Sequence, residues 1–230
     1  MISQQKDKYC INCSCQNHIF HVLSDSELEK VNAHRTEIKF KRGDTIFKQG
    51  GPAMQVLLFT DGMAKINIEA NGKNLIIGII TQGSLVAGPG MHTDNRHYYS
   101  VVALKDCSVC AVDQSVFQAL LLNNAAFLNT YLKYINEIYI ETLGRLTNQA
   151  YKQVKGKVAD AIIYLSEHIY KAYNFELILS TREIANLSGV SKESTARTLK
   201  ELSDENIIRL NRQEINVLNP ERLHQLSKMG

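Results

Sequence analysis

The chain has 230 residues, of which 44% are hydrophobic and 21% are charged, and its formal net charge is +3. This length can supply one or two domains with a full core, and the balance of residue types is that of a soluble globular protein. A net charge so close to zero does not by itself indicate nucleic-acid binding, so a basic surface would have to be local. No apolar run is long enough to span a membrane and the start lacks a signal-peptide core, which predicts a cytoplasmic protein without membrane contact.

Three of the five cysteines lie close together near the start of the chain, at positions 10, 13 and 15. A reducing cytoplasm disfavours a disulfide framework. We therefore interpret these thiols either as buried or reactive cysteines or as part of a metal or redox site. Residues 1–22 are predicted to form a cysteine-bearing N-terminal segment.

Residues 23–122 are predicted to form a domain built mainly of short β-strands. From residue 37 to about residue 112 the hydrophobic pattern has a period of two, and glycine-containing pairs separate the apolar runs. The Asp-Gly pair at 61–62 and the Asn-Gly pair at 71–72 are strong hairpin signals. The pattern predicts an antiparallel β-roll or jelly roll.

Residues 123–150 are predicted to form one long helix. Apolar residues recur along it at alternating spacings of four and three, which is the pattern of a seam with a partner helix. Alternatively, one face packs on the chain's own β-roll, and Phe127, Tyr131 and Ile138 are candidates for that role. Because both faces are apolar, we favour both uses at once and predict a two-fold homodimer. The predicted dimer seam consists of Leu128, Leu132, Ile135, Tyr139 and Leu146.

Residues 151–230 are predicted to form the C-terminal domain. The segment 152–157 is basic and polar and contains Gly156, so we interpret it as a hinge. Helical periodicity then predicts a helix over 157–170. The residues expected to face inward are Val158, Ile162, Leu165 and Ile169.

Two short helices around a tight turn are predicted between residues 180 and 202. Ser180 and Glu183 have the spacing of a capping box at the start of the first helix. Gly189 can supply the positive φ that a sharp turn between helices needs, and Ser191 can cap the second helix. The second helix is expected to turn Thr195, Thr198, Leu199 and Leu202 inward and Lys192, Glu193, Ala196, Arg197 and Lys200 outward.

The outward face of this second helix carries groups suited to reading base pairs. A guanidinium donates two parallel hydrogen bonds to guanine, and a carboxylate accepts one from the amino group of cytosine. Glu193 and Arg197 are one turn apart, so both can reach neighbouring base pairs from one helix. The alternative is a solvated surface ion pair, which is common. The segment 210–218 that follows is predicted to be a two-stranded wing with its turn near 211–213.

These residues resemble the cyclic-AMP receptor protein and fumarate–nitrate regulator (CRP/FNR) family. The match is carried by Thr-Arg-Glu-Ile-Ala at 181–185, by Gly-Val-Ser-Lys-Glu-Ser-Thr-Ala-Arg at 189–197, and by a Gly-x-x-Ile-Phe-x-x-Gly pattern at 43–50. The resemblance implies an α+β fold with an N-terminal cyclic-nucleotide-binding-like antiparallel β-roll, a long dimerisation helix and a C-terminal winged helix-turn-helix. It also implies DNA contacts from Thr181, Arg182, Ser191, Lys192, Glu193, Arg197 and Lys200.

The partners that the resemblance implies are palindromic double-stranded DNA, a second copy of the chain and RNA polymerase. Lys192 stands where the family reads DNA with arginine, which keeps the attraction to phosphate and weakens bidentate recognition. The sequence shows no nucleophile–base arrangement or phosphate loop, so we do not expect an enzyme. The alternatives are a binding module that regulates a partner protein and an iron–sulfur regulator that senses oxygen or redox state.

The effector pocket is where the sequence departs from the family pattern. Cyclic-nucleotide binders of this kind use a Gly-Glu-Leu turn for the ribose and an Arg-Ser or Arg-Thr pair for the phosphate. Here the turn has no carboxylate, and a His-Tyr pair stands at the second position with an arginine one residue out of register. A buried phosphate without its guanidinium is deprived of a charge-assisted hydrogen bond, so we expect an effector other than cyclic AMP. The alternative is a filled β-roll interior. The predicted pocket residues are Gly83, Ser84, Leu85, Arg96, His97 and Tyr98.

The cysteines resemble the ligands of fumarate–nitrate-regulator-type sensors, which hold a [4Fe–4S] cluster. Cys10 and Cys13 match the opening Cys-x-x-Cys, and Cys110 resembles the distant fourth ligand. Cys15 is the candidate for the third ligand, although it lies much closer to Cys13 than the family spacing. Zinc, or no cofactor at all, are the alternatives that the residues leave open.

Overall fold

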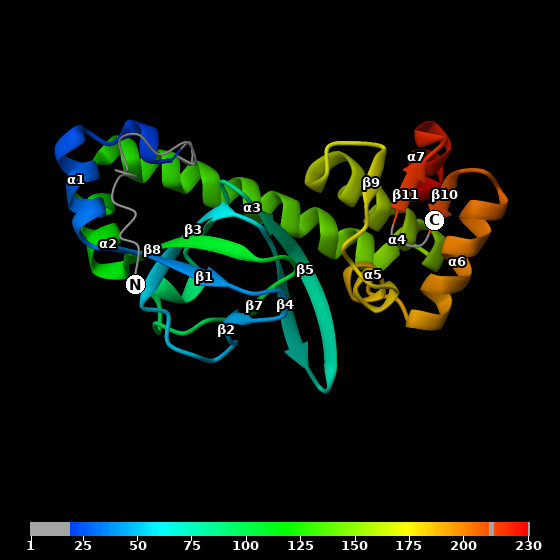
Figure 1. Ribbon diagram of the computed structural model, residues 1–230, viewed down its shortest axis with the longest axis horizontal. Coiled ribbons are helices and arrows are strands. Elements are labelled where there is room, and N and C mark those ends of the chain that lie inside the picture. The colour runs from blue at the N-terminus through cyan, green and yellow to red at the C-terminus, as the bar shows by residue number, and fades with distance from the viewer. Residues whose placement is uncertain (1–18, 212–213, 230) are drawn as a thin grey trace, which may run out of the picture. The chain divides into compact units, whose positions relative to one another are not determined.

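The computed structural model describes residues 19–211 and 214–229, and these form two compact units (Figure 1). Unit 1 comprises Met1–Ala64 with Ile80–Tyr139, and unit 2 comprises Lys65–Ile79 with Ile140–Gly230. The described residues of each unit have their own core and are treated separately below.

Unit 1 is built around antiparallel strands, as the period-two pattern predicts. One sheet has the strand order β1-β8-β3-β6, and Arg35 of β1 lies opposite Val112 of β8. A second sheet has the order β2-β7-β4-β5, and most residues of its strands β4 and β5 belong to unit 2. The strands are β1 (Arg35–Phe40), β2 (Thr45–Phe47), β3 (Gln55–Asp61), β4 (Met63–Ala70), β5 (Lys73–Thr81), β6 (Leu85–Val86), β7 (Ser100–Ala103) and β8 (Cys107–Asp113).

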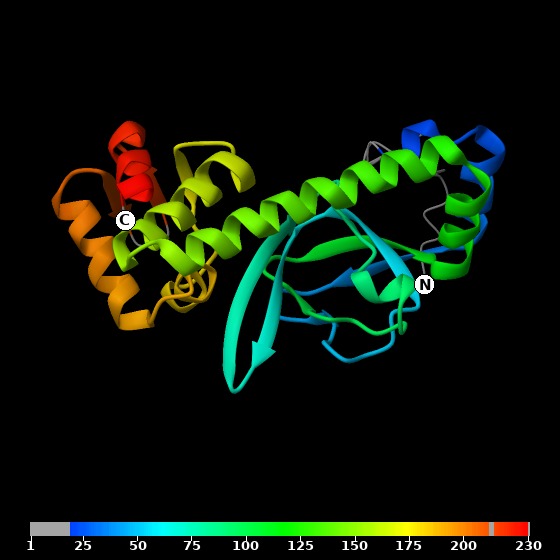
Figure 2. The same ribbon diagram turned by 180° about the vertical axis from the view of Figure 1, so that it is seen from behind.

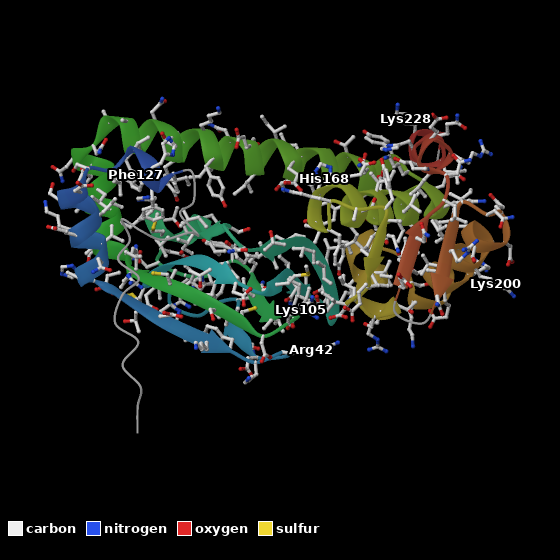
Figure 3. The ribbon with its side chains drawn as sticks, turned by 45° about the horizontal axis from the view of Figure 1, so that its top comes forward. Arg42, Lys105, Phe127, His168, Lys200 and Lys228 are labelled. Atoms are coloured by element: carbon white, nitrogen blue, oxygen red, sulfur yellow. The ribbon has the colours of Figure 1, made fainter. Side chains whose placement is uncertain are left out.

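Helices close one end of this roll around an aromatic cluster. They are η2 (Phe20–Val22), α1 (Asp25–Ala33), α2 (Gln114–Asn123) and the first turns of α3 (Ala125–Tyr151), while the short η3 (Pro89–His92) follows β6. The rings of Phe117 and Phe127 meet edge-to-face with centroids 5.4 Å apart, and Tyr131 meets Phe117 at 5.2 Å. Edge-to-face contacts between buried rings add to the stabilisation from area burial alone. Figure 3 labels Phe127 on the inner side of α3.

The helix predicted over residues 123–150 is confirmed as α3, which can be followed over its whole length in Figure 2. Phe127 and Tyr131 are buried in the core of unit 1, as expected for the face that packs on the β-roll. Ile138 was expected on that same face, and this expectation is wrong because its side chain is 46% exposed.

Unit 2 contains a winged helix whose first helix begins earlier than predicted. Gln153 is the N-cap of α4, so only two residues separate α3 from α4, and Gly156 is buried inside the helix instead of breaking it. The last part of the predicted helix is a π-helical segment, η4. The helices are α4 (Val154–Ile163), η4 (Tyr164–Ile169), α5 (Thr181–Ser188), α6 (Lys192–Asp204) and α7 (Pro220–Met229).

The wing has three strands where two were predicted. Strands β10 (Ile208–Asn211) and β11 (Glu214–Val217) form the expected hairpin, and its turn at 212–213 lies outside the described residues. The unpredicted strand β9 (Asn174–Glu176) pairs with β11, and Phe175 lies opposite Ile215. This strand lacks a sequence signal because three residues are too few to show a period.

Candidate nucleic-acid interface and effector segment

The first helix of the pair, α5, begins with the predicted capping box. The Glu183 amide donates to Ser180 Oγ at 3.3 Å, and the Ser180 amide donates to Glu183 Oε2 at 2.8 Å. These two bonds satisfy amides that have no partner within the helix. The helix ends at Gly189, whose φ of 63° is left-handed. A Cβ at Gly189 would also meet the end of the flexible Gln149 side chain, which can move aside, so the positive φ is the reason that this turn favours glycine.

The second helix, α6, begins where Ser191 Oγ accepts a hydrogen bond from the Ser194 amide at 3.2 Å. This cap fixes the start of the helix and therefore the rotation of every side chain that follows. The residues predicted to face inward, Thr195, Thr198, Leu199 and Leu202, are all buried. The residues predicted to face outward, Lys192, Glu193, Ala196, Arg197 and Lys200, are all exposed. Figure 3 shows Lys200 on the outer side of α6.

The charged groups on this outer face do not neutralise one another. Across the part of the chain that the structure describes, neither Glu193 nor Arg197 takes part in an ion pair. A surface ion pair between them was the alternative to base reading. The geometry instead leaves a carboxylate and a guanidinium, one helical turn apart, available to an external partner.

A salt bridge that the sequence does not reveal supports the start of α5. Lys65 Nζ of β4 lies 2.6 Å from Glu183 Oε1, and both side chains are about 20% exposed. Burial tends to raise the pKa of Glu183, but the bonds from Lys65 and Ser180 outweigh it and hold that pKa below its usual value. The carboxylate that caps α5 is therefore kept charged by the β4–β5 hairpin of the same unit.

In unit 1, the turn predicted to form part of the effector pocket is tied to β3. The Gly83 amide donates to the Phe59 carbonyl at 2.8 Å, and the Phe59 amide donates to the Ser84 carbonyl at 3.0 Å. Ser84 Oγ accepts from the Thr81 amide at 3.3 Å, so this hydroxyl is used within its own turn. Leu85 is buried.

The second part of the predicted pocket alternates between outside and inside. Arg96 and Tyr98 are exposed, and the Tyr98 hydroxyl donates to Asp94 Oδ2 at 3.1 Å. His97 and Tyr99 lie on the inner side, and a Cβ at Gly88 would be 3.8 Å from His97 Nδ1 and 3.8 Å from the Tyr99 hydroxyl. Arg96 and Tyr98 therefore do not share the half-buried position of His97. Tyr99 lies with His97 instead, since both are close to Gly88, and no periodic pattern marks this pair because residues 97–99 lie outside the strands.

The inner histidine lies in an apolar setting. Its ring stacks on Phe47 with centroids 3.7 Å apart, and its Nδ1 is buried without a hydrogen-bond partner among the described residues. Burial lowers the pKa of His97, while a hydrogen bond with the Pro52 carbonyl raises it to a smaller extent. Burial also raises the pKa of the Tyr99 phenol. Both groups are therefore uncharged at neutral pH.

The predicted dimer seam is an apolar face on the outside of α3. Its residues are 39–59% exposed, in contrast to Phe127 and Tyr131 on the opposite side. A contiguous exposed apolar surface of this kind marks an interaction site in a soluble protein. The five seam residues Leu128, Leu132, Ile135, Tyr139 and Leu146 all lie on it.

Of the four cysteines proposed as cluster ligands, Cys10, Cys13 and Cys15 lie outside the described residues. Cys110 is buried in β8, where Arg35 Nη1 lies 3.8 Å from its sulfur. Cys107 is engaged elsewhere, because its one S–H lies within hydrogen-bonding distance of the carbonyls of Met63 and Lys105, at 3.3 and 3.1 Å. Within the described residues, no group of three His, Cys, Asp or Glu side chains is arranged to hold a metal ion.

Comparison with known proteins places two family models on the chain. The model described as "Cyclic nucleotide-binding domain" matches residues 37–124, and the model described as "Crp-like helix-turn-helix domain" matches residues 156–226. The first covers most of the strands of the β-roll, and the second covers the winged helix. Among the described residues, no helix is both long and apolar enough to cross a bilayer.

Individual relatives match between 80% and 95% of the chain. The transcriptional regulatory protein btr of Bordetella pertussis is 24% identical over 225 residues, which cover 95% of this chain and 93% of that protein. The cAMP-activated global transcriptional regulator CRP of Salmonella typhimurium is 23% identical over 190 residues, covering 80% and 90% respectively. The solved structure of FixK2 from Bradyrhizobium japonicum matches with a TM-score of 0.76 at 20% identity, over 84% of this chain and 96% of that one. These matches confirm the predicted α+β architecture, and the names of the relatives from Bordetella pertussis and Salmonella typhimurium describe them as transcriptional regulators.

Proposed function

The chain belongs to the CRP/FNR family of DNA-binding transcription regulators, and we propose that it acts as a homodimer that reads a palindromic site under the control of an effector other than cyclic AMP. In this proposal the β-roll holds the sensor, α3 joins two copies, and each α6 enters a major groove. Contact with RNA polymerase and a cytoplasmic location remain predictions from the family resemblance.

The outer face of α6 is the observation that carries the proposal for DNA reading. The Ser191 cap and the buried residues of α6 fix the position and rotation of the helix. Glu193 and Arg197 then lie on its exposed side, where a carboxylate and a guanidinium can reach base pairs. In a two-fold dimer the two copies of α6 would meet successive major grooves about 34 Å apart. Thr181, Arg182, Ser191, Lys192 and Lys200 are assigned to contacts with the phosphate backbone or groove edge, which position the helix.

Replacing Arg197 tests this assignment directly. On the preferred site, selected from a random DNA library, Arg197→Ala should cost about 1–3 kcal/mol and relax the preference at one base position in each half-site. Lys200→Ala is the matched control, because removing an ammonium that binds phosphate should weaken binding on all sequences alike and lower the salt dependence. If Arg197→Ala kept the preferred sequence and the affinity of the wild type, the assignment would be wrong.

The inner chemistry of the β-roll supports the part of the proposal that concerns the effector. The relative from Salmonella typhimurium is named as cAMP-activated, but here Ser84 replaces the ribose-binding carboxylate and His97 is uncharged. Arg96, the nearest guanidinium in sequence, is exposed. A cyclic phosphate placed beside His97 would gain no positive charge there. A calorimetric titration with cyclic AMP tests this part of the proposal.

An iron–sulfur cluster remains a hypothesis based on the family resemblance. Cys110 is the one proposed ligand in the described part of the chain, and its burial in β8 is compatible with a ligand that meets the N-terminal segment. The residues that would complete the cluster, Cys10, Cys13 and Cys15, lie outside that part. The absorption spectrum of protein purified without oxygen, together with iron analysis, is the measurement that decides it.

A further inference from the structure

Unit 2 contains a cavity whose lining residues include none from the outer face of α6 and none of the predicted effector-pocket residues of unit 1. Its volume is about 380 Å³. It is lined by β5, the C-terminal half of α3, α4 with η4, and the end of α5, all of which belong to unit 2. His168 of η4, labelled in Figure 3, is one of its lining residues. Cavities of this size hold small organic molecules in other proteins.

Most of the cavity wall is apolar. Side chains of several different elements supply it, so a ligand would be held on more than one side. The principal apolar lining residues are Leu75, Ile77, Leu146, Ala161, Ile163 and Leu187. An aliphatic chain would bury its surface against these side chains at a gain of about 25 cal/mol per Å² removed from water.

Three of the charged groups in the wall are already neutralised or fully engaged. Arg145 donates to the Ile77 carbonyl and to Glu141 Oε1, each at 3.0 Å, and its guanidinium carbon lies 3.7 Å from the centre of the Tyr164 ring. Glu141 is therefore paired with Arg145. Asp160 is paired with Lys152 at 2.6 Å and also accepts a hydrogen bond from Ser227. None of these three groups needs a further charged partner.

Lys157 is the exception. It is half-buried in the cavity wall, and no ion pair to its ammonium is found among residues 19–211 and 214–229. The first turn of α4 contains no acidic residue, and Asp160, which follows three positions later on α4, is already paired with Lys152. It also lies near the positive end of the helix dipole, which disfavours a cation. A half-buried lysine with no ion-pair partner beside apolar walls is well matched by a single anionic group.

We propose that this cavity binds a small amphipathic monocarboxylate, with its carboxylate on Lys157 and its aliphatic chain along the apolar wall. A single ammonium matches a single carboxylate, whereas a phosphate dianion would need several donors. Because the walls come from β5, α3, α4 and α5, a bound ligand would contact both the helix-turn-helix and the C-terminal end of α3. Any consequence for DNA affinity rests on the proposed function, but the binding itself does not.

The test uses the full-length protein without DNA and octanoate as the probe. Calorimetry should show saturable binding of one octanoate per chain. Lys157→Met should weaken it roughly 10- to 100-fold, as expected for loss of a charge-assisted bond. Lys157→Arg should retain most of the affinity. Octanamide, which has the same chain and a neutral head, should bind the wild type as weakly as octanoate binds Lys157→Met.

Lys155→Met is the matched control, because Lys155 lies on the same helix, is paired with Glu205 at 2.6 Å and does not line the cavity. It should bind octanoate like the wild type. The proposal is overturned if octanoate does not bind the wild type. It is equally overturned if octanoate binds Lys157→Met as tightly as it binds the wild type and octanamide binds the wild type as tightly as octanoate does. It is also overturned if octanoate binds only when the predicted seam is disrupted, which would mean that a second copy fills the cavity. Since the readout is octanoate binding alone, none of these results depends on DNA reading.

Discussion

The winged helix and the β-roll distribute polar and apolar side chains in opposite ways at their candidate sites. In the winged helix, charged groups such as Arg197 lie outside and Leu199 and Leu202 lie inside. In unit 1, by contrast, apolar side chains of α3 lie outside, and the polar groups of His97 and Tyr99 face inward. A polar outer face is stable in the free protein, because water solvates its charged groups until DNA binds. An apolar outer face and a polar interior each remain incomplete until something covers or pairs them.

The largest expected effect comes from making the outside of α3 polar. The double variant Leu132→Asp with Ile135→Asp should convert a dimer into monomers, because four carboxylates would face one another across the seam. Specific DNA affinity should fall on the order of 10²- to 10⁴-fold, since each half-site would then bind without the help of the other. Sedimentation at micromolar concentration and DNA titration measure the two effects.

The control for this variant is Leu122→Asp, which alters a side chain that is also apolar and exposed but lies on α2, outside the seam. It should leave both the dimer and the DNA affinity unchanged. A monomeric wild type, or a double variant that remained dimeric, would show that the apolar face of α3 has another purpose.

The outward and inward faces differ in how far the sequence could predict them. On α6, a capping serine and a clean helical period fix the rotation locally, so the exposure of Arg197 and the burial of Leu202 could both be predicted. Residues 97–99 lie outside the strands, so the orientation of their side chains follows from tertiary packing and no period in the sequence predicts it. The sequence therefore suggests His97 with Tyr98, whereas the structure brings His97 together with Tyr99.

Long-range pairs mark the second limit of prediction. Lys65 and Glu183 are separated by 118 positions, and nothing local in either segment indicates their salt bridge. Gly156 illustrates a third limit, because glycine disfavours a helix only weakly and close packing overrides that preference. The parts of the site that follow from caps, turns and periodicity were predictable, and the parts that follow from tertiary packing were not.

The next effect concerns the uncharged interior of the β-roll. The affinity of this protein for cyclic AMP should be lower, by a factor of about 30 or more, than that of a pocket that keeps the phosphate-binding guanidinium. The reason is that loss of a buried charged hydrogen bond costs about 2–5 kcal/mol. Calorimetry on the purified protein should therefore show no saturable binding at low micromolar nucleotide. Arg96→Ala is the decisive companion, because it removes the nearest guanidinium. Saturable binding by the wild type that disappears in Arg96→Ala would mean that the segment can shift its register and turn Arg96 inward.

The smallest effect tests a half-buried charge of the winged helix, the Glu183 carboxylate. Burial opposes ionisation of Glu183, but the bonds from Lys65 and Ser180 prevail and keep its pKa below the ordinary value of 4.5. A carboxylate with a lowered pKa contributes stability that is fully present above that ordinary value and is lost as the pH falls through the folded-state value. Glu183→Gln should therefore be less stable than the wild type at pH 7, and the gap should narrow as the pH is lowered from about 5 to about 3. Urea denaturation across this range measures both curves. Glu193→Gln, on the exposed face of α6, controls for the change in net charge and should follow the wild type. If the Glu183→Gln and wild-type curves ran parallel at all pH values, the salt bridge between Lys65 and Glu183 would contribute nothing to the charge state of this cap.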